Sequence, residues 1–299
     1  MEIDQKIVVV AGSTASGKSE VALSLANEFK GELICSDSMQ VYRHMDVGTA
    51  KPSLRERTLV PHHQLDLINP DENYSAGQYA RDTSKIIKNI QERGRLPILV
   101  GGTGLYLRAL MNGISKIPRI PESLRKEITC WYDEYGNKHC HNLLQKYDPE
   151  GAALVHPNDT SRILRSLEVV IFTGESIFSY RTAQPFGTSI YKSYEVALNW
   201  DRNELYNRIN NRTISMLGSG WLAEVEMLLE SYSPKLKPMN SIGYREVVQY
   251  LQNKLNWDTM VDEIQKRTRQ FAKRQLTWFR SEEKIEWYKP DEKDRILAD

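Results

Sequence analysis

The chain has 299 residues, a net charge of +1 at pH 7, and 40% hydrophobic and 26% charged residues, a composition typical of soluble globular proteins. No apolar run approaches the roughly 18 residues that a membrane span needs, and the amino terminus shows no signal-peptide pattern. We therefore expect a cytoplasmic protein of one large domain or two. Because the net charge is close to zero, any nucleic-acid surface has to be a local patch.

The cysteine content favours a reducing compartment. Cys35, Cys130 and Cys140 are the three cysteines of the chain, too few for a disulfide framework. The run His139-Cys140-His141 suggests zinc, but adjacent side chains point apart, and we interpret these residues as surface polar groups.

The segment "KIVVVAGSTASGKSE" (6–20) combines the patterns of a strand, a glycine-rich loop and a helix. Ile7–Val10 is an apolar, β-branched run typical of a buried parallel strand. The glycines of G-x-x-x-x-G-K-S let successive backbone N–H groups face one centre at a helix N-terminus. Lys18 brings a positive charge to bound phosphates, and the Ser19 hydroxyl is a ligand for Mg²⁺. The predicted diphosphate site is Gly12, Ser13, Thr14, Ala15, Ser16, Gly17, Lys18 and Ser19, and the alternative is a turn that matches by chance.

Two further loops follow predicted strands. Asp37 comes just after the strand Gly31–Cys35, and in an open α/β sheet ligands bind beyond the carboxyl ends of the strands. Asp37 either faces that crevice or caps a helix, and its position alone leaves the two interpretations even. Gly101–Gly104 follows the strand Ile98–Val100 and either offers backbone donors to the same crevice or allows close strand–helix packing.

The middle of the chain changes character. After a strand and turn over 62–74, Ser75 is expected to cap a helix that runs to about residue 93. Residues 122–178 read as helices, and 191–198 as a strand that returns to the sheet. We predict an α/β fold: a P-loop parallel sheet flanked by helices, formed by 1–113 and 193–299, with an all-helical insertion of residues 114–192.

The remainder is predicted to be helical, ending in a helix over 257–280. Between Glu263 and Glu282 there is no acidic residue. At 100° per residue, one broad face carries Lys266, Arg267, Arg269, Lys273, Arg274 and Arg280, and the complementary face carries Ile264, Phe271, Ala272, Trp278 and Phe279. This basic face is either solvated or binds a phosphate backbone, and we favour the polyanion.

Over nearly its whole length the chain resembles the bacterial tRNA dimethylallyltransferases. The matching stretches are "STASGKS" (13–19), "SDSMQVYRHMDVGTAKP" (36–52), "DENYSAGQYARD" (71–82), "LPILVGGTGLYLRAL" (96–110), "HPNDTSRILRSLEV" (156–169), "SIGYREVVQYL" (241–251) and "TRQFAKRQLTWFR" (268–280). Ser13 stands where the family usually has proline, and Ser19 where threonine is common. The zinc finger of eukaryotic relatives is not seen.

The resemblance implies a prenyl transfer. The P-loop would hold the diphosphate of dimethylallyl diphosphate with Mg²⁺ on Ser19, and the exocyclic amine of the adenosine 3′ to the anticodon would accept the dimethylallyl group. Asp37 would be the general base, Thr14 and Thr103 would orient the reacting groups, and Arg208 would reach the diphosphate together with Lys18.

The resemblance also implies a tRNA surface for the anticodon stem-loop, whose target base must leave its stack. The implied tRNA contacts are Asp37, Ser38, Met39, Gln40, Thr103, Arg125, Asp159, Thr160, Ser161, Arg162, Ile163, Ser241, Ile242, Gly243, Tyr244, Arg245, Lys273, Arg274, Gln275 and Arg280. We infer no obligate protein partner and no membrane contact.

Two other functions compete with this one. A P-loop small-molecule kinase explains the P-loop and Asp37 but leaves the insertion and the basic helix without a role. An RNA-binding protein switched by a nucleoside triphosphate explains the basic helix but gives Asp37 and Gly101–Gly104 no role.

Overall fold

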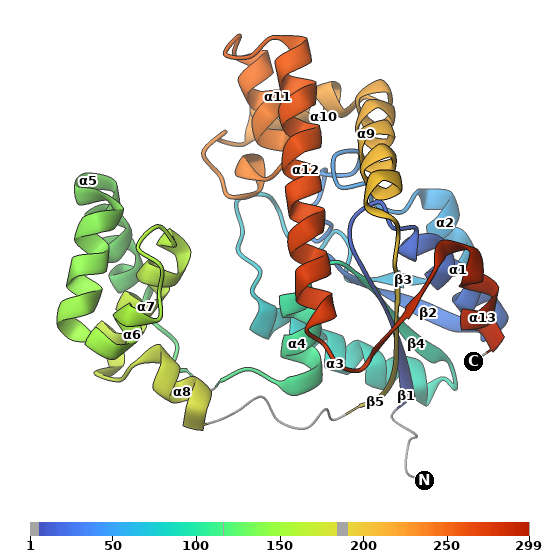
Figure 1. Ribbon diagram of the computed structural model, residues 1–299, viewed down its shortest axis with the longest axis horizontal. Coiled ribbons are helices and arrows are strands. Elements are labelled where there is room, and N and C mark those ends of the chain that lie inside the picture. Colours follow the sequence, from blue (N-terminus) through green and yellow to red (C-terminus); the bar gives the residue numbers. More distant parts are fainter. Residues whose placement is uncertain (1–5, 116, 184–190, 299) are drawn as a thin grey trace. The chain divides into compact units, whose positions relative to one another are not determined.

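The computed structural model describes residues 6–115, 117–183 and 191–298 (Figure 1). The chain forms two compact units, Met1–Met111 with Ser189–Asp299, and Asn112–Thr188. The residue bounds of the second unit differ by only a few residues from those of the predicted insertion, 114–192. In the described ranges, no helix has the length and apolarity that crossing a bilayer requires.

The first unit is built on a six-stranded parallel sheet with the order β3-β2-β4-β1-β5-β6. The strands are β1 (Lys6–Ala11), β2 (Gly31–Ser36), β3 (His62–His63), β4 (Leu96–Gly101), β5 (Lys192–Leu198) and β6 (Ile285–Tyr288). The prediction that everything after β5 is helical was wrong, because β6 extends the sheet beside β5. Its four residues lie in a charged tail and pair on one side only, so the sequence gives little strand signal.

Both faces of the sheet are covered, which explains the continuous apolar run of β1. Ile7 and Val9 pack into a core with Leu99 of β4. Apolar residues of α3 (Ala76–Glu92), α4 (Gly104–Asn112) and α12 (Trp257–Arg280), among them Tyr79, complete this core. Val8 and Val10 point to the opposite face, toward α1 (Lys18–Glu28) and α13 (Lys293–Ala298). The prediction that Ser75 caps α3 is confirmed, since its side chain accepts a hydrogen bond from the Gln78 backbone.

A group of helices beyond the sheet forms a separate apolar core. It contains α9 (Arg202–Gly218), α10 (Trp221–Ser231), α11 (Tyr244–Leu251) and the first half of α12. A short helix, α2 (Leu54–Leu59), follows the loop after β2. The bounds of α12 agree with the prediction of 257–280. Figure 1 shows α12 running from this group of helices down to α4, so one helix serves both cores.

The second unit is entirely helical in its described part. It contains α5 (Glu122–Tyr147), α6 (Pro149–Ala153), α7 (Thr160–Thr173) and α8 (Ile177–Ala183). Gly136, with φ of 76°, interrupts α5, a conformation that favours glycine. Cys140 is fully buried in the core of this unit, so its interpretation as a surface residue was wrong. Among the described residues, no cluster of metal-ligating side chains occurs.

Candidate active site

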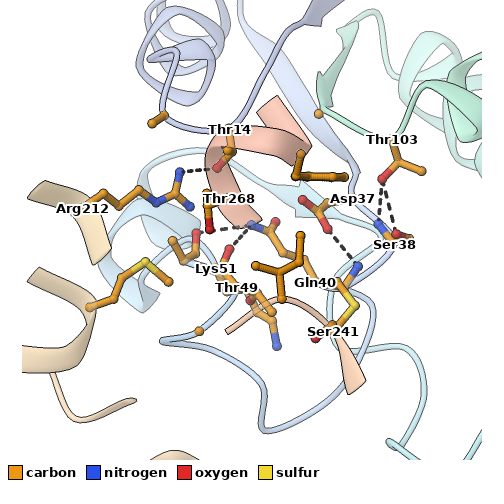
Figure 2. Close-up of a pocket in the computed structure, with 18 of the residues that line it drawn as sticks. Thr14, Asp37, Ser38, Gln40, Thr49, Lys51, Thr103, Arg212, Ser241 and Thr268 are labelled. Atoms are coloured by element: carbon orange, nitrogen blue, oxygen red, sulfur yellow. Dashed lines mark hydrogen bonds between the residues drawn. The ribbon is translucent and has the colours of Figure 1, made fainter. Parts of the chain in front are cut away.

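Three loops meet at the carboxyl edge of the sheet because β1, β4 and β2 are neighbours. They are the P-loop after β1, the glycine-rich loop after β4 and the segment that begins with Asp37 after β2. A cavity of about 680 Å³ opens there, lined by these loops and by α9, α10, α11 and α12. Thr14, Asp37 and Thr103 reach it from the three different loops (Figure 2).

Two glycines of the P-loop have backbone conformations that favour glycine. Gly12 and Gly17 have φ of 148° and 92°, which residues with a side chain rarely adopt. The Lys18 ammonium donates to the Ser13 carbonyl at 3.0 Å. Burial, reinforced by the charge of Arg212, lowers the pKa of Lys18 to about 8. A bound anion would reverse this effect, so the site is electrostatically prepared for phosphate.

The predicted phosphate-binding residues are not equally placed. Thr14, Ala15, Lys18 and Ser19 line the cavity. Ser13 and Ser16 are almost completely buried, and within the described structure their hydroxyls have no hydrogen-bond partner. These two serines can offer a ligand their backbone but not their side chains.

Arg212, which the sequence prediction left out, lies in the cavity in place of Arg208. Arg212 donates from Nη1 to the Thr14 hydroxyl at 3.1 Å and lines the cavity (Figure 2). Arg208 instead donates from Nε to the Ala15 carbonyl at 2.8 Å and stacks on Trp200, its guanidinium carbon 4.2 Å from the ring centroid. Within the described structure Arg208 does not line the cavity, and it holds the P-loop through its bond to Ala15. Arg212 lies four residues after Arg208 and so on the same helix face, which is the sequence signal that could have pointed to it.

Asp37 caps a turn rather than a helix. Its Oδ1 accepts a hydrogen bond from the Met39 backbone at 2.8 Å, and the residues that follow form turns. The prediction of a helix cap was therefore wrong in its detail, although the carboxylate does fix the local backbone. Oδ2 has no hydrogen-bond partner in the described part of the chain, and Asp37 lies near the charges of Lys18 and Arg212. One oxygen thus positions the residue, and the other is free for chemistry.

The loop Gly101–Gly104 owes its glycines to close packing. A Cβ on Gly101 would lie 2.1 Å from the Ser36 carbonyl oxygen, and one on Gly102 would lie 2.2 Å from Nε2 of Gln275. On Gly104 it would lie 2.2 Å from Nε1 of Trp278. Of the two interpretations, strand–helix packing is the one that the contacts support. Thr103 accepts a hydrogen bond from the Ser38 backbone at 3.0 Å and so joins the loops after β4 and β2.

Polar side chains stabilise the segment from Ser38 to Lys51. The Gln40 amide donates to the carbonyls of Thr49 and Ala50 at 3.1 and 3.2 Å. The carboxylate of Glu224, from α10, accepts from three consecutive backbone N–H groups, those of residues 46–48. Because the amide hydrogens of Gln40 are already engaged, its predicted contact with tRNA would have to use other atoms. Ser38 and Met39 line the cavity.

The loop before α11 lies at another part of the cavity. Ser241 and Ile242 of this loop, and Arg245 at the start of α11, line the cavity and are only partly buried. Tyr244 is buried and donates its hydroxyl to Glu224 at 2.6 Å. A Cβ on Gly243 would lie 2.1 Å from the Trp221 ring. Gly243 and Tyr244 therefore shape this wall, and their predicted contact with tRNA is not needed to explain them.

The basic face of α12 is less uniform than the helical projection suggested. Lys266 pairs with Glu263 at 2.8 Å, and Arg267 contacts Glu246 and Glu263 at 3.3 and 3.1 Å. Lys273, Arg274 and Arg280 are exposed, as predicted for a surface that binds phosphates. Phe271, which the projection put on the complementary face, is 37% exposed and lines the cavity.

In the helical unit, the predicted tRNA contacts divide into exposed and buried residues. Asp159 caps α7 by accepting from the Arg162 backbone at 3.2 Å, and Thr160 begins this helix. Ser161 and Arg162 are exposed, whereas Ile163 is fully buried. The side chain of Ile163 therefore packs the core of the unit and cannot contact RNA. Arg125 lies 3.7 Å from the Glu168 carboxylate.

The parallel sheet and the P-loop at its carboxyl edge define a P-loop α/β protein, with a cavity at that edge lined by Lys18 and Arg212. Residues 40–282 match the family model described as IPP transferase. The chain belongs to this family.

Curated relatives agree with that assignment. A protein of Syntrophus aciditrophicus named tRNA dimethylallyltransferase 2 is 41% identical over 98% of this chain and 94% of its own length. One of Geotalea uraniireducens with the same name is 44% identical over 94% of this chain and 91% of its own length.

Solved structures are similar in fold. The tRNA isopentenylpyrophosphate transferase of Bacillus halodurans is 35% identical, with a TM-score of 0.73 over 98% of this chain and 95% of its own. A eukaryotic dimethylallyltransferase, whose structures are described as crystallographic snapshots of the enzyme acting on tRNA, is 33% identical, with a TM-score of 0.78. That similarity covers 92% of this chain and 70% of the other.

Proposed function

We propose that the protein transfers a dimethylallyl group from dimethylallyl diphosphate to tRNA and releases diphosphate. The acceptor in this proposal is the exocyclic amine of the adenosine on the 3′ side of the anticodon. The observation that carries the proposal is the shared cavity of Lys18, Arg212 and Asp37, in a chain whose relatives are named tRNA dimethylallyltransferases.

The cationic side of the cavity suits the leaving group. When the allylic C–O bond breaks, its electron pair leaves with the diphosphate, and negative charge grows on the phosphate oxygens. The P-loop amides, Lys18 and Arg212 can stabilise this charge because they are held in place before the reaction. Both arginines are hydrogen-bonded to the P-loop, but of the two Arg212 lines the cavity, which favours it over Arg208 as the arginine at the reacting end.

The donor set also fits a Mg²⁺ ion. Ser19 is exposed, lines the cavity and occupies the magnesium-ligand position of the P-loop. Magnesium sites of this kind use few protein ligands and several phosphate and water oxygens, which agrees with the lack of a carboxylate or histidine cluster among the described residues. Bound there, Mg²⁺ would neutralise charge on the departing diphosphate.

Asp37 suits the acceptor. An aromatic amine is a weak nucleophile because its lone pair is delocalised, so it needs a base to take its proton as the new C–N bond forms. Oδ2 of Asp37 is available for that proton, while Oδ1 stays bound to the Met39 backbone. Thr103, anchored to Ser38, and Thr14 are placed to orient the amine and the base.

The proposal extends to RNA binding. The exposed residues Lys273, Arg274 and Arg280 of α12 would contact phosphates of the anticodon stem-loop, and Arg162 would do so from the helical unit. The target base would then leave its stack to enter the cavity.

Incubation of an anticodon stem-loop RNA with dimethylallyl diphosphate and Mg²⁺, followed by mass analysis of its nucleosides, tests the function. We expect one dimethylallyl group on the adenosine 3′ to the anticodon, and none when guanosine replaces that adenosine. A modified nucleoside at another position, or none at all, would contradict the proposal.

A further inference from the structure

Helix α12 reaches the centre of the site with a buried amide. Gln275 is only 8% exposed, whereas Lys273 and Arg274 beside it are exposed. Oε1 of Gln275 accepts from the Thr14 backbone N–H at 2.8 Å, and its Nε2 donates to the Gly102 carbonyl at 2.9 Å. One side chain therefore joins α12, the P-loop and the loop after β4.

The fit around this amide is tight. A Cβ on Gly102 would lie 2.2 Å from Nε2 of Gln275, far inside van der Waals contact. One turn along α12, the Trp278 ring fills the space beside Gly104 and carries the Arg108 guanidinium 4.1 Å from its centroid. Gly102 and Gly104 of this loop leave room for the α12 side chains Gln275 and Trp278, so the helix and the loop pack in close contact.

The contact also determines what Thr14 offers a ligand. Backbone N–H groups of a P-loop normally face the phosphates, but the N–H of Thr14 is directed to Gln275. Its hydroxyl is held from the other side by Arg212 of α9. Two helices outside the P-loop, α9 and α12, therefore hold the conformation of Thr14. A displacement of α12 would move the backbone of the P-loop at Thr14.

We propose that Gln275 is a positioning residue through which α12 controls the geometry of the diphosphate loop. Because exposed cations flank it on α12, binding of RNA to this helix and binding of diphosphate in the P-loop are energetically coupled. The coupling is reciprocal, so each ligand strengthens binding of the other by the same factor. This inference rests on the proposed function, since it takes α12 as the RNA-binding helix.

Two variants disrupt the hydrogen bonds of Gln275 with Thr14 and Gly102, one from α12 and one from the loop after β4. Gln275→Met keeps the size of the side chain and removes both hydrogen bonds. Gly102→Ala keeps the Gln275 side chain, but the added Cβ would lie 2.2 Å from its Nε2 and 3.1 Å from the Gly12 carbonyl oxygen, so it displaces the end of the amide. Gly102 does not have the positive φ that would strain alanine. Thr277→Ala, an exposed position on the same helix, is the matched control.

The experiment measures the affinity of an anticodon stem-loop RNA with and without unreactive dimethylallyl thiolodiphosphate. We expect the analogue to strengthen RNA binding by roughly 5- to 150-fold in the unaltered protein and in Thr277→Ala, the usual range of such coupling. In Gln275→Met and Gly102→Ala the factor should fall toward one, and Gly102→Ala should leave the affinity for RNA alone nearly unchanged.

Gln275→Glu gives a signature that a merely structural residue would not produce. A protonated glutamic acid has both a donor and an acceptor, whereas the carboxylate lacks the donor for Gly102. The coupling factor of this variant, relative to that of the unaltered protein, should recover as the pH falls, and that of Gln275→Met should not.

The outcomes distinguish a failure of the role of Gln275 from a failure of the proposed function. Full coupling in both Gln275→Met and Gly102→Ala, or a factor of one in the unaltered protein, would overturn the role of Gln275 while leaving the transferase function standing. Failure of the unaltered protein to bind RNA or the diphosphate analogue would overturn the proposed function itself, and this inference with it.

Discussion

Raising the pH above 8 should weaken the binding of dimethylallyl diphosphate through Lys18. Burial and Arg212 lower the pKa of Lys18 to about 8 in the free protein. A bound diphosphate stabilises the ammonium and raises this pKa, so binding takes up a proton whenever the pH lies between the two pKa values. With a free-protein pKa of about 8, the ammonium is mostly present at pH 7 and is present in about a tenth of the molecules at pH 9. The affinity at pH 9 should therefore be roughly tenfold lower than at pH 7.

Calorimetry without tRNA, in buffers of different ionisation enthalpy, measures both the affinity and the proton uptake. We expect about half a proton taken up at pH 8 and nearly one at pH 9. In Lys18→Arg the guanidinium stays charged over this range, so its affinity should not fall in the same way. An affinity for the unaltered protein that is flat from pH 7 to 9, with no proton uptake, would refute the assignment of Lys18 to the diphosphate.

Asp37→Asn keeps an oxygen for the Met39 backbone but removes the base, so single-turnover rates should fall by about 10²- to 10⁴-fold with little change in diphosphate affinity; a rate within a few-fold of the unaltered protein would place the base elsewhere. Arg212→Gln should lower the turnover number more than Arg208→Gln, because only Arg212 lines the cavity, whereas Arg208→Gln should mainly lower the melting temperature; the reverse ranking would contradict these roles. Replacing Lys273, Arg274 and Arg280 by Gln should make the salt dependence of tRNA affinity shallower by somewhat less than one log–log unit per contact, whereas the control Lys266→Gln, which removes a residue paired with Glu263, should not; an unchanged slope in the triple variant would mean that this face is only solvated.

The sequence was most informative where local chemistry and chain order agree. Strand, loop and helix signals coincide around residues 6–20, and the structure has β1, the P-loop and α1 there. The final helix has the predicted bounds, and Asn256 caps its start by accepting a hydrogen bond from the Thr259 backbone.

The sequence was least informative about which side chain reaches which loop. Arg208 and Arg212 share one helix face, and only the tertiary structure shows that Arg208 is held by Trp200 and Ala15 while Arg212 enters the cavity. The same limit applies to Gln275, which reads as one polar residue in a basic run. Its partners are 261 and 173 residues away, and no local pattern reports such contacts.

Residues of one predicted tRNA-binding motif differ in their exposure to solvent. Ile163 lies within the motif of exposed Ser161 and Arg162, but it is one turn from other core residues of α7 and is fully buried. Its apolar character was a sufficient signal, since an apolar residue on the inner stripe of an amphipathic helix belongs to the core.

The most direct test of the account is a stoichiometry. The diphosphate released and the dimethylallyl-adenosine formed in tRNA are measured in the same reaction, once with dimethylallyl diphosphate and once with ATP as the only donor. We predict one diphosphate for each dimethylallyl group transferred, and no phosphate or diphosphate release from ATP. Consumption of ATP, or diphosphate release without a modified tRNA, would contradict a P-loop that serves prenyl transfer.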